Sequence, residues 1–464
     1  MTQTIDSAVH RLREILDGQV IEPADPDYDQ ARKLWNADID RHPAVIARCA
    51  GATDVAAAIG FAREHGLEIA VRGGAHSMSG ASSVDGGLVV DLSLLREVSV
   101  DPQTRRARVG GGALLSDLDA ATAPHGLAVP AGLISHTGVG GLTLGGGMGW
   151  LTRRAGLTID SLASAQVVLA DGRIVRTSSD QHPDLFWAIR GGGGNFGVVT
   201  EFEFHLHDLD PTVQFGMFFW GLDQGRDVLR LARDLIAGMP SEVNIVIAGL
   251  NAPPAPFVPE QHHFQPGYAL LLTGFDGTPH HAALADRIRA ELPPLFDMVT
   301  PMPYVALQQM IDGANGWGQF NYEKSTYLPE LTDSVIDVIT EHLPAKSSPL
   351  SVVLFYRLDE AYCAVADDDT AFGGTRTPRY AAFIVAVTPD QATLAADRAW
   401  VRTLFDALQP ASRDTGTYIN AMTEYDEHRV RTTYGPGKYA RLAQVKTVYD
   451  PGNVFHRNIN IKPA

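Results

Sequence analysis

The sequence predicts an α+β protein in two parts, a glycine-rich part that binds a ligand and a part with one antiparallel sheet. Three observations support this prediction. Short strand and helix patterns alternate up to about residue 206, with clusters of glycine among them. Long aromatic strand patterns separated by amphipathic helices fill residues 207–415, and residues 416–464 return to loops and short elements. The glycine clusters occupy residues 73–87, 110–112, 138–149 and 191–197.

The first part has clear local signals. The apolar-periodic stretch VAAAIGFAREH predicts a helix that Thr53-Asp54 caps at its start and Gly66 ends. The stretches LEIAV, GLVVDLS and RRARVGG predict strands. AQVVLADGRIVRTS predicts a hairpin whose two-residue turn is Asp171-Gly172.

The second part predicts an antiparallel sheet covered by helices. Its strand patterns are VQFGMFFWGL, YALLLTGF, SPLSVVLFYRL and YAAFIVAV, and its helix patterns are GRDVLRLARDLIAGM, HAALADRIRAEL and DRAWVRTLFDAL. The proline-rich residues 251–267 predict an exposed loop. Six aromatic residues are candidates for an apolar pocket or, equally, for the sheet core. They are Phe215, Phe218, Trp220, Trp317, Tyr322 and Tyr356.

Composition excludes several classes of function. The net charge of −17 disfavours binding to nucleic acid and to anionic membranes. Cys49 and Cys363 are too few for a disulfide framework, and the adjacent histidine pairs at 262–263 and 280–281 lack partners at ligand spacing, so we expect no metal. No stretch approaches the roughly 18 apolar residues of a membrane span, and the N-terminus lacks the apolar core of a signal peptide. We therefore expect a cytoplasmic protein.

The glycine clusters indicate a cofactor site. No P-loop pattern occurs. Gly192, Gly194 and Gly197 match G-x-G-x-x-G, but a helix pattern precedes them and a strand pattern follows, which reverses the Rossmann order. The uncharged run at 138–149 suits a large planar ligand with an anionic tail, and FAD is such a ligand. The alternative is that these glycines only let strands pack closely.

Four segments resemble FAD-linked oxidases of the berberine-bridge type, within the vanillyl-alcohol-oxidase superfamily. They are RGGAHSMSG, PAGLISHTGVGGLTLGGGMGWLTRRAGLTID, ADGRIVRTSSDQHPDLFWAIRGGGGNFGVVTEFEF and YARLAQVKTVYDPGNVFHRNINI. Their order and spacing follow the family over nearly the whole chain. The resemblance implies a PCMH-type FAD-binding domain formed by residues 1–206 and the C-terminal segment 416–464. A substrate-binding domain, residues 207–415, is inserted between them.

The resemblance also implies how FAD is held. His76 matches the histidine that the family bonds covalently to the flavin 8α-methyl group, and Arg72 matches the family's arginine. A second, cysteine link occurs in many relatives, but Ile134 stands at that position here, so a single link through His76 is expected. The other implied FAD contacts are Gly73, Gly74, Ala75, Ser77, Gly132, Thr137, Gly140, Gly141, Gly145, Gly147, Gly197, Val199, Asn458 and Asn460.

The resemblance further implies an oxidase that uses O2, takes a hydride from a small secondary metabolite or alcohol, and releases H2O2. Thr137 occupies the position that controls oxygen access, and its small size favours an oxidase over a dehydrogenase. His136-Thr137 also resembles the pair in relatives that form a flavin-N5-oxide and oxygenate polyketides. A third alternative is a flavin-holding binding or resistance protein with little turnover.

Tyr418 matches a tyrosine that acts as the base in relatives. A normal tyrosine pKa near 10 makes it a poor base, so it needs a nearby cation or a strong hydrogen bond. Tyr418 is equally suited to a place in the core. We expect the protein to be a monomer or a homodimer.

Overall fold

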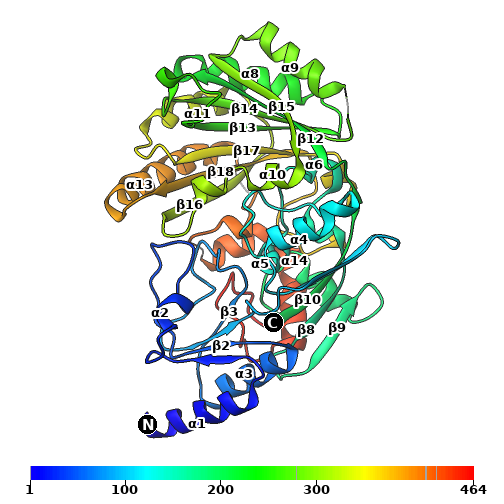
Figure 1. Ribbon diagram of the computed structural model, residues 1–464, viewed down its shortest axis with the longest axis vertical. Helices are drawn as coiled ribbons and strands as arrows, with labels where there is room; N and C mark the ends of the chain where they lie inside the picture. The colour runs from blue at the N-terminus through cyan, green and yellow to red at the C-terminus, as the bar shows by residue number, and fades with distance from the viewer. Residues whose placement is uncertain (1, 278, 413–414, 425) are drawn as a thin grey trace.

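The computed structural model describes residues 2–277, 279–412, 415–424 and 426–464. Two halves lie one above the other in Figure 1. The lower, glycine-rich half contains a four-stranded sheet, a five-stranded sheet and the C-terminal helix. The upper, seven-stranded half contains one large sheet and its helices.

Two helices pack against one face of the four-stranded sheet. Helices α1 (Thr2–Ile15) and α3 (Ala52–Glu64) share an apolar cluster with its strands. The strands β2 and β3 run parallel to β4, while β1 is antiparallel. In sheet order the strands are β1 (Gln19–Ile21), β2 (Val45–Arg48), β4 (Leu88–Asp91) and β3 (Ile69–Arg72).

The start of α3 differs from the prediction. Gly51 is the capping residue, and Thr53 and Asp54 lie inside the first turn. The Asp54 carboxylate instead accepts hydrogen bonds from the backbone N–H groups of Asp17, Gly18 and Ala50. The side chain therefore joins two chain segments, a contact that local sequence does not indicate.

The five-stranded sheet is antiparallel throughout. The predicted hairpin is confirmed, because β8 pairs with β9 and Gly172 has a φ of 86° at the turn. The short pair β7 (Leu127–Ala128) and β11 (His207–Asp208) lies beside it. In sheet order the five strands are β5 (Val98–Asp101), β6 (Arg106–Gly110), β10 (Val198–His205), β8 (Leu162–Val168) and β9 (Ile174–Ser178).

Short helices connect these strands. One of them, α5, covers most of the glycine run at 138–149, which the sequence suggested was a loop. The helices of this region are α2 (Tyr28–Ala31), α4 (Leu115–Thr122), α5 (Val139–Gly145), α6 (Thr152–Ala155) and α7 (Pro183–Ile189).

The large sheet is antiparallel, as predicted, and has seven strands where the sequence indicated four. The additional strands are β13, β15 and β16; β15 contains two prolines and lies at the sheet edge, where a lost N–H donor is tolerated. In sheet order the strands are β15 (Phe296–Pro303), β12 (Thr212–Gly221), β14 (Pro266–Gly274), β13 (Val243–Asn251), β17 (Val352–Leu358), β18 (Arg379–Thr388) and β16 (Phe320–Leu328).

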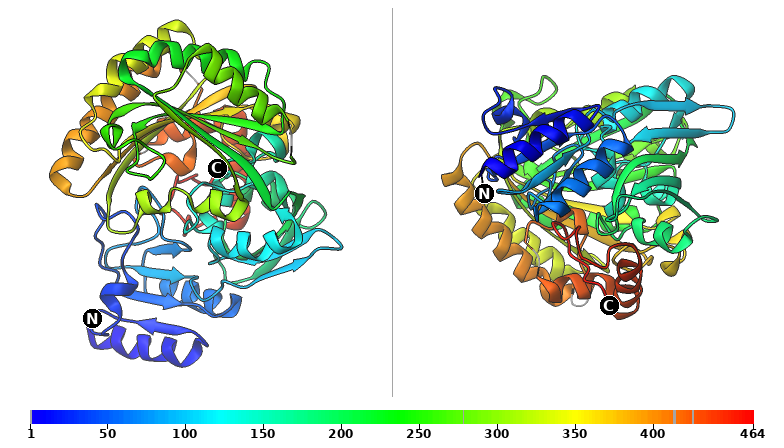
Figure 2. Two further views of the ribbon diagram at one scale, coloured as in Figure 1. Left: turned by 45° about the horizontal axis from the view of Figure 1, so that its top comes forward. Right: turned by 90° about the horizontal axis from the view of Figure 1, so that it is seen from below.

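The two faces of this sheet have different neighbours. Figure 2 shows long helices over one face, while the other turns toward the glycine-rich half. Phe218, Trp220 and Tyr322 pack beneath the helices as core residues, whereas Phe215 and Tyr356 lie on the opposite face. The covering helices are α8 (Gly225–Ile236), α9 (His280–Glu291), α11 (Asp333–His342) and α13 (Gln391–Leu408). Short α10 (Tyr304–Gln309) contacts α4 of the glycine-rich half, and α12 (Ala361–Ala364) contacts α6.

The C-terminal segment departs most from the prediction. It contains a 23-residue helix, α14 (Glu427–Tyr449), where loops and short elements were expected. Gly435, with a φ of 71°, and Pro436 kink this helix and interrupt its periodic pattern, which hid it. Tyr439, Leu442 and Val445 nevertheless join the core beneath the five-stranded sheet. No helix in the described part of the chain is long and apolar enough to cross a membrane.

Candidate active site

Two glycine loops meet backbone to backbone at the centre of the glycine-rich half. A Cβ on Gly74 would lie 2.2 Å from the backbone nitrogen of Gly138, and one on Gly138 would lie 2.3 Å from that of Gly74. Ala75 follows with a φ of 58°, in the left-handed region. The side chain of Arg72 donates to the carbonyl of Ala31 and so fixes the start of this loop. The 72–77 loop is therefore held close to residues 137–138.

His76, at the end of this loop, lies in a group of aromatic rings. Its Nε2 is 2.7 Å from Nδ1 of His136, and its ring stacks on Trp35 with centroids 4.5 Å apart. Burial, and after it the charge of His136, lowers the pKa of His76 from 6.5 to about 3. His76 is consequently neutral throughout the physiological range. A neutral imidazole has the free lone pair that a nucleophile needs.

The end of α5 is joined to the segment that carries Tyr418. Gly147 donates its N–H to the Tyr418 hydroxyl at 2.9 Å, and Asn420 donates Nδ2 to the same oxygen at 2.9 Å. Asn420 also donates to the carbonyl of Leu142, and a Cβ on Gly145 would lie 2.0 Å from its Oδ1. These contacts join segments that lie 271 to 278 positions apart in the sequence.

The surroundings of Tyr418 make it a weak base. Its oxygen accepts two hydrogen bonds, which favour the ionised form, but burial outweighs them and raises the pKa to about 12. No cation pairs with it among the described residues. Tyr418 at neutral pH is a protonated hydroxyl whose own hydrogen is available to a ligand.

Glu323, on β16, is a group that the sequence reasoning missed. It lies opposite Val385 of β18 and two residues from Ser325, whose hydroxyl contacts Thr417 and the backbone of Tyr418. Alternate residues of a strand share a face, so Glu323 and Ser325 both point toward the Tyr418 segment. The only signal in the sequence was an acidic residue at an inward position of the strand FNYEKSTYL.

Glu323 is 8% exposed, and no hydrogen bond or ion pair to its carboxyl occurs in the part of the chain that the structure describes. Burial raises its pKa from 4.5 to about 8. A carboxyl with this pKa can hold or accept a proton near neutral pH.

The C-terminal tail closes the opposite side of the site. Asn458 donates to the carbonyl of Gly194, and Asn195 donates to those of Gly192 and Ile459. The Oδ1 atoms of Asn458 and Asn460 are buried, and neither has a hydrogen-bond partner among the described residues. Buried polar atoms without partners in a native structure call for an explanation, and a bound ligand provides one.

The predicted glycines serve two purposes. At six of them a protein atom lies within 3.0 Å of the Cβ position, which supports close packing: Gly74, Gly132, Gly140, Gly145, Gly147 and Gly197. Around Gly141 no atom lies within 4 Å of that position, and Gly73 meets only a carbonyl oxygen at 3.3 Å. Within the described part of the chain, the Ser77 hydroxyl hydrogen-bonds only groups of its own loop, and Val199 is buried in β10. These loops, the neutral His76 and the unpartnered asparagine oxygens fit FAD.

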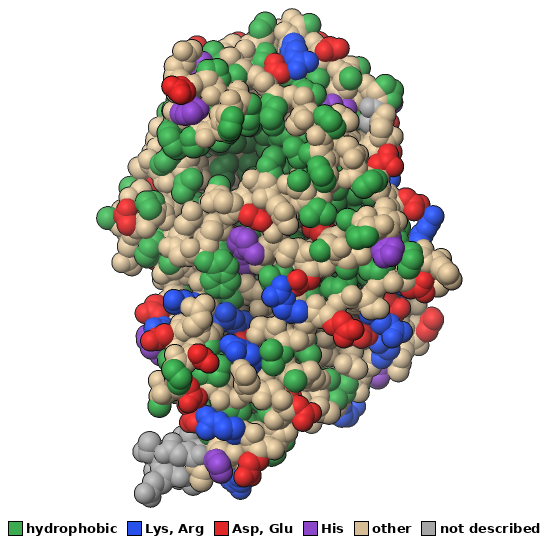
Figure 3. Space-filling view, viewed as in Figure 1, with side chains coloured by type: hydrophobic (Ala, Val, Ile, Leu, Met, Phe, Trp, Pro, Cys, Tyr) green, Lys and Arg blue, Asp and Glu red, His purple; other side chains and the backbone are tan. Residues whose placement is uncertain are grey.

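A hollow lies on the face of the molecule seen in Figure 3, over the large sheet and lined by hydrophobic side chains. The sheet face turned toward the glycine-rich half is apolar and includes Met217, Phe219, Val246, Leu271 and Phe383. The polar side chains of Glu323 and Ser325 lie on this face at its β16 edge. The surface is therefore suited to a small ligand with an apolar body and one polar group.

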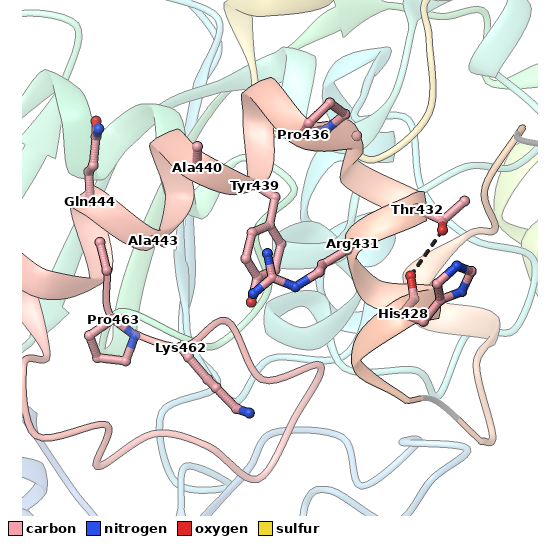
Figure 4. A pocket seen from close by; sticks show the side chains of 12 residues that line it. His428, Arg431, Thr432, Pro436, Tyr439, Ala440, Ala443, Gln444, Lys462 and Pro463 are labelled. Atoms are coloured by element: carbon pink, nitrogen blue, oxygen red, sulfur yellow. Dashed lines mark hydrogen bonds between the residues drawn. The ribbon is translucent and has the colours of Figure 1, made fainter.

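A separate pocket of about 740 Å³ lies between kinked α14 and the end of the chain (Figure 4). Arg431 and Lys462, which line it, both pair with Glu427, at 2.9 and 2.7 Å. None of the predicted flavin contacts lines this pocket. Its charged side chains are already paired, so we assign it no role in the chemistry.

Two family comparisons agree with this site. A family described as FAD binding domain matches residues 43–178, and one described as berberine and berberine like matches residues 417–462. An FAD-linked oxidoreductase of Dictyostelium discoideum is 30% identical over 460 residues, covering 98% of this chain and 97% of that protein. The (R)-6-hydroxynicotine oxidase of Paenarthrobacter nicotinovorans is 31% identical over 463 residues, covering 97% of each.

Solved structures show the same fold. The 6-hydroxy-D-nicotine oxidase of Arthrobacter nicotinovorans has a TM-score of 0.84 at 27% identity, over 97% of this chain and 98% of that one. A xylooligosaccharide oxidase of Myceliophthora thermophila has a TM-score of 0.85 at 22% identity, over 99% of each chain, and supports the fold alone. The chain belongs to the berberine-bridge-like FAD-linked oxidoreductases. The predicted family and α+β fold class are confirmed.

Proposed function

We propose that this protein is an FAD-linked oxidase that holds its flavin through one covalent bond to His76 and oxidises a small alcohol or amine with O2. The observation that carries the proposal is the buried, neutral His76 between the two glycine loops, 2.7 Å from His136. The similarity to an (R)-6-hydroxynicotine oxidase over nearly the whole chain supports the class of reaction. When bound, FAD accepts a hydride and passes two electrons to O2.

The residues of this chain orient the substrate and handle its proton. Tyr418 and Asn420 are held by α5, which places the tyrosine hydroxyl at the joint between the two halves. We assign to Tyr418 the orientation of the substrate's polar group, because its raised pKa makes it a donor. Glu323 has the pKa better matched to accepting a proton at neutral pH.

The remaining contacts hold the cofactor. Arg72, Gly73, Gly74 and Ser77 form one loop beside the ring site, and Asn458 and Asn460 close over it from the tail. Thr137 lies between His136 and Gly138, next to this loop, and its small side chain leaves room for O2. These roles are part of the proposal.

Acid precipitation tests the covalent link. We expect the flavin of the wild-type protein to stay with the precipitate and to fluoresce on a denaturing gel, and the His76→Ala protein to release all its flavin. Retention of bound flavin by His76→Ala would place the link elsewhere. Anaerobic mixing with a panel of alcohols and amines should bleach the flavin, and air should restore its colour with formation of H2O2. Persistent reduced flavin in air would instead indicate a dehydrogenase or a binding protein.

A further inference from the structure

A loop of the seven-stranded half reaches into the flavin site. It runs from α10 to β16, and its Asp312 carboxylate accepts hydrogen bonds from both the N–H and the hydroxyl of Ser135, at 2.8 and 2.5 Å. The carbonyl of Asn315, in the same loop, accepts the Trp35 indole N–H at 2.7 Å. The edge of Trp317 faces His76 with ring centroids 6.4 Å apart. This loop therefore contacts Ser135 and Trp35, which lie beside the histidine pair His76 and His136, and it also contacts His76 itself.

The loop also determines which ring nitrogen of His136 carries the hydrogen. The ring of His136 hydrogen-bonds the backbone of Asn315, and this bond raises its pKa, so the ring is the donor and the carbonyl the acceptor. Because Nδ1 of His136 faces His76, the donating nitrogen is Nε2. In neutral His136, Nδ1 then carries the lone pair.

The protonation of His76 follows from that of its partner. Burial lowers the pKa of both histidines, so both rings are neutral. The Nδ1 lone pair of His136 requires a donor, and the donor is the Nε2–H of His76. The Nδ1 atom of His76 is consequently left with a free lone pair, and no hydrogen bond reaches it within the described residues.

We infer that His136, oriented by the 312–315 loop, is the base that enables covalent attachment of FAD to His76. The inference rests on the proposed function, which supplies the bond itself. In the reaction, Nδ1 of His76 forms a bond to the flavin 8α-carbon, and a C–H bond of that methyl group breaks. His136 takes the Nε2 proton that His76 must lose. The two electrons left on the flavin reduce O2, and with the two protons they give H2O2.

The geometry makes this role specific to His136. An imidazole alkylated at Nδ1 while it keeps its Nε2 proton is a cation, and burial at this position disfavours a cation. A base 2.7 Å away removes that cost. Asp312 is a positioning residue, because it holds Ser135, the neighbour of His136, and its charge raises the proton affinity of His136.

The test measures attachment rather than turnover. Purified variants are incubated with added FAD in air, and at intervals the protein is precipitated with acid and its bound flavin measured by fluorescence. Total flavin before precipitation is measured by absorbance. For His136→Ala we expect attachment at least about tenfold slower, with total flavin retained and attachment restored by added imidazole. For Asp312→Asn, which keeps both histidines, we expect attachment about threefold slower.

The controls separate this inference from the proposed function. His281→Asn alters another buried histidine, which contacts a backbone carbonyl in the large sheet, and should attach flavin at the wild-type rate. Acid release of all flavin from the wild type would refute the covalent link and, with it, this inference. A covalent wild type, a non-covalent His76→Ala and a His136→Ala that attaches flavin normally would refute the inference alone. Should His136→Ala fail to fold, normal attachment in Asp312→Asn would likewise refute it.

Discussion

The two halves of the molecule build their parts of the site from different atoms. The glycine-rich half uses backbone: Gly74 and Gly138 approach so closely that neither position admits a Cβ. The seven-stranded half uses side chains on one face of a sheet, with Glu323 among apolar neighbours. Backbone contacts restrict the residue type to glycine and leave a pattern in the sequence. Side chains on a sheet face can be exchanged one by one, so they leave little pattern.

Replacement of Gly74 by valine should have the largest effect. The Cβ would lie 2.2 Å from a backbone nitrogen, an atom that cannot move aside as the end of a side chain can. We expect the flavin content, measured as the ratio of absorbance at 450 to 280 nm, to fall below about a tenth of wild type. Gly60→Ala is the control, since α3 has open space at that position. Normal flavin content in Gly74→Val would show that the two loops need not touch.

Removal of the Tyr418 hydroxyl, at the joint between the two halves, should have the second-largest effect. We expect Tyr418→Phe to keep its flavin and to slow flavin reduction by substrate by about 10- to 100-fold, because the substrate loses the hydroxyl that orients its polar group. Stopped-flow absorbance under anaerobic conditions measures this rate. Tyr380→Phe alters a tyrosine on the helix-covered face of the seven-stranded sheet and should leave the rate unchanged. Equal rates in both variants would remove Tyr418 from the reaction.

Replacement of Glu323 by glutamine should have the smallest effect, a change in how the stability of the protein depends on pH. The carboxyl's folded pKa of about 8 exceeds the ordinary 4.5, so between these values the folded protein binds more protons than the unfolded chain. Its contribution is therefore complete below pH 4.5 and is lost as the pH rises through 8. We expect the wild-type Tm to fall by about 2 °C or more between pH 5 and 8.5, relative to Glu323→Gln. Thermal unfolding of the two flavin-loaded proteins gives this difference, and parallel curves would mean that the carboxyl is normally solvated.

Much of the fold could be predicted, for reasons that differ between elements. The hairpin at Asp171-Gly172 and the strands of β12, β14, β17 and β18 have strong local patterns. Strand β16 mixes polar and apolar residues, so it lacks the apolar alternation of a strand. Gly435 and Pro436 interrupt α14, so its apolar residues do not repeat at helical spacing. Tertiary packing stabilises both, since α14 joins the core of the five-stranded sheet and β16 completes the large one.

The candidate site divides in the same way. The sequence by itself predicted the family and the glycine loops, because tight backbone approach restricts residue type, and its resemblance to the family pointed to His76, His136 and Tyr418 as candidates. Only the tertiary structure decided that Nε2 of His76 faces Nδ1 of His136, that Asp312 and Asn315 reach this pair from the other half, and that Glu323 is buried without a partner. The contacts of His136 with His76 and of Asp312 with Ser135 join residues separated by 60 or more positions. Their strength depends on orientation and burial, which arise when the two halves pack together.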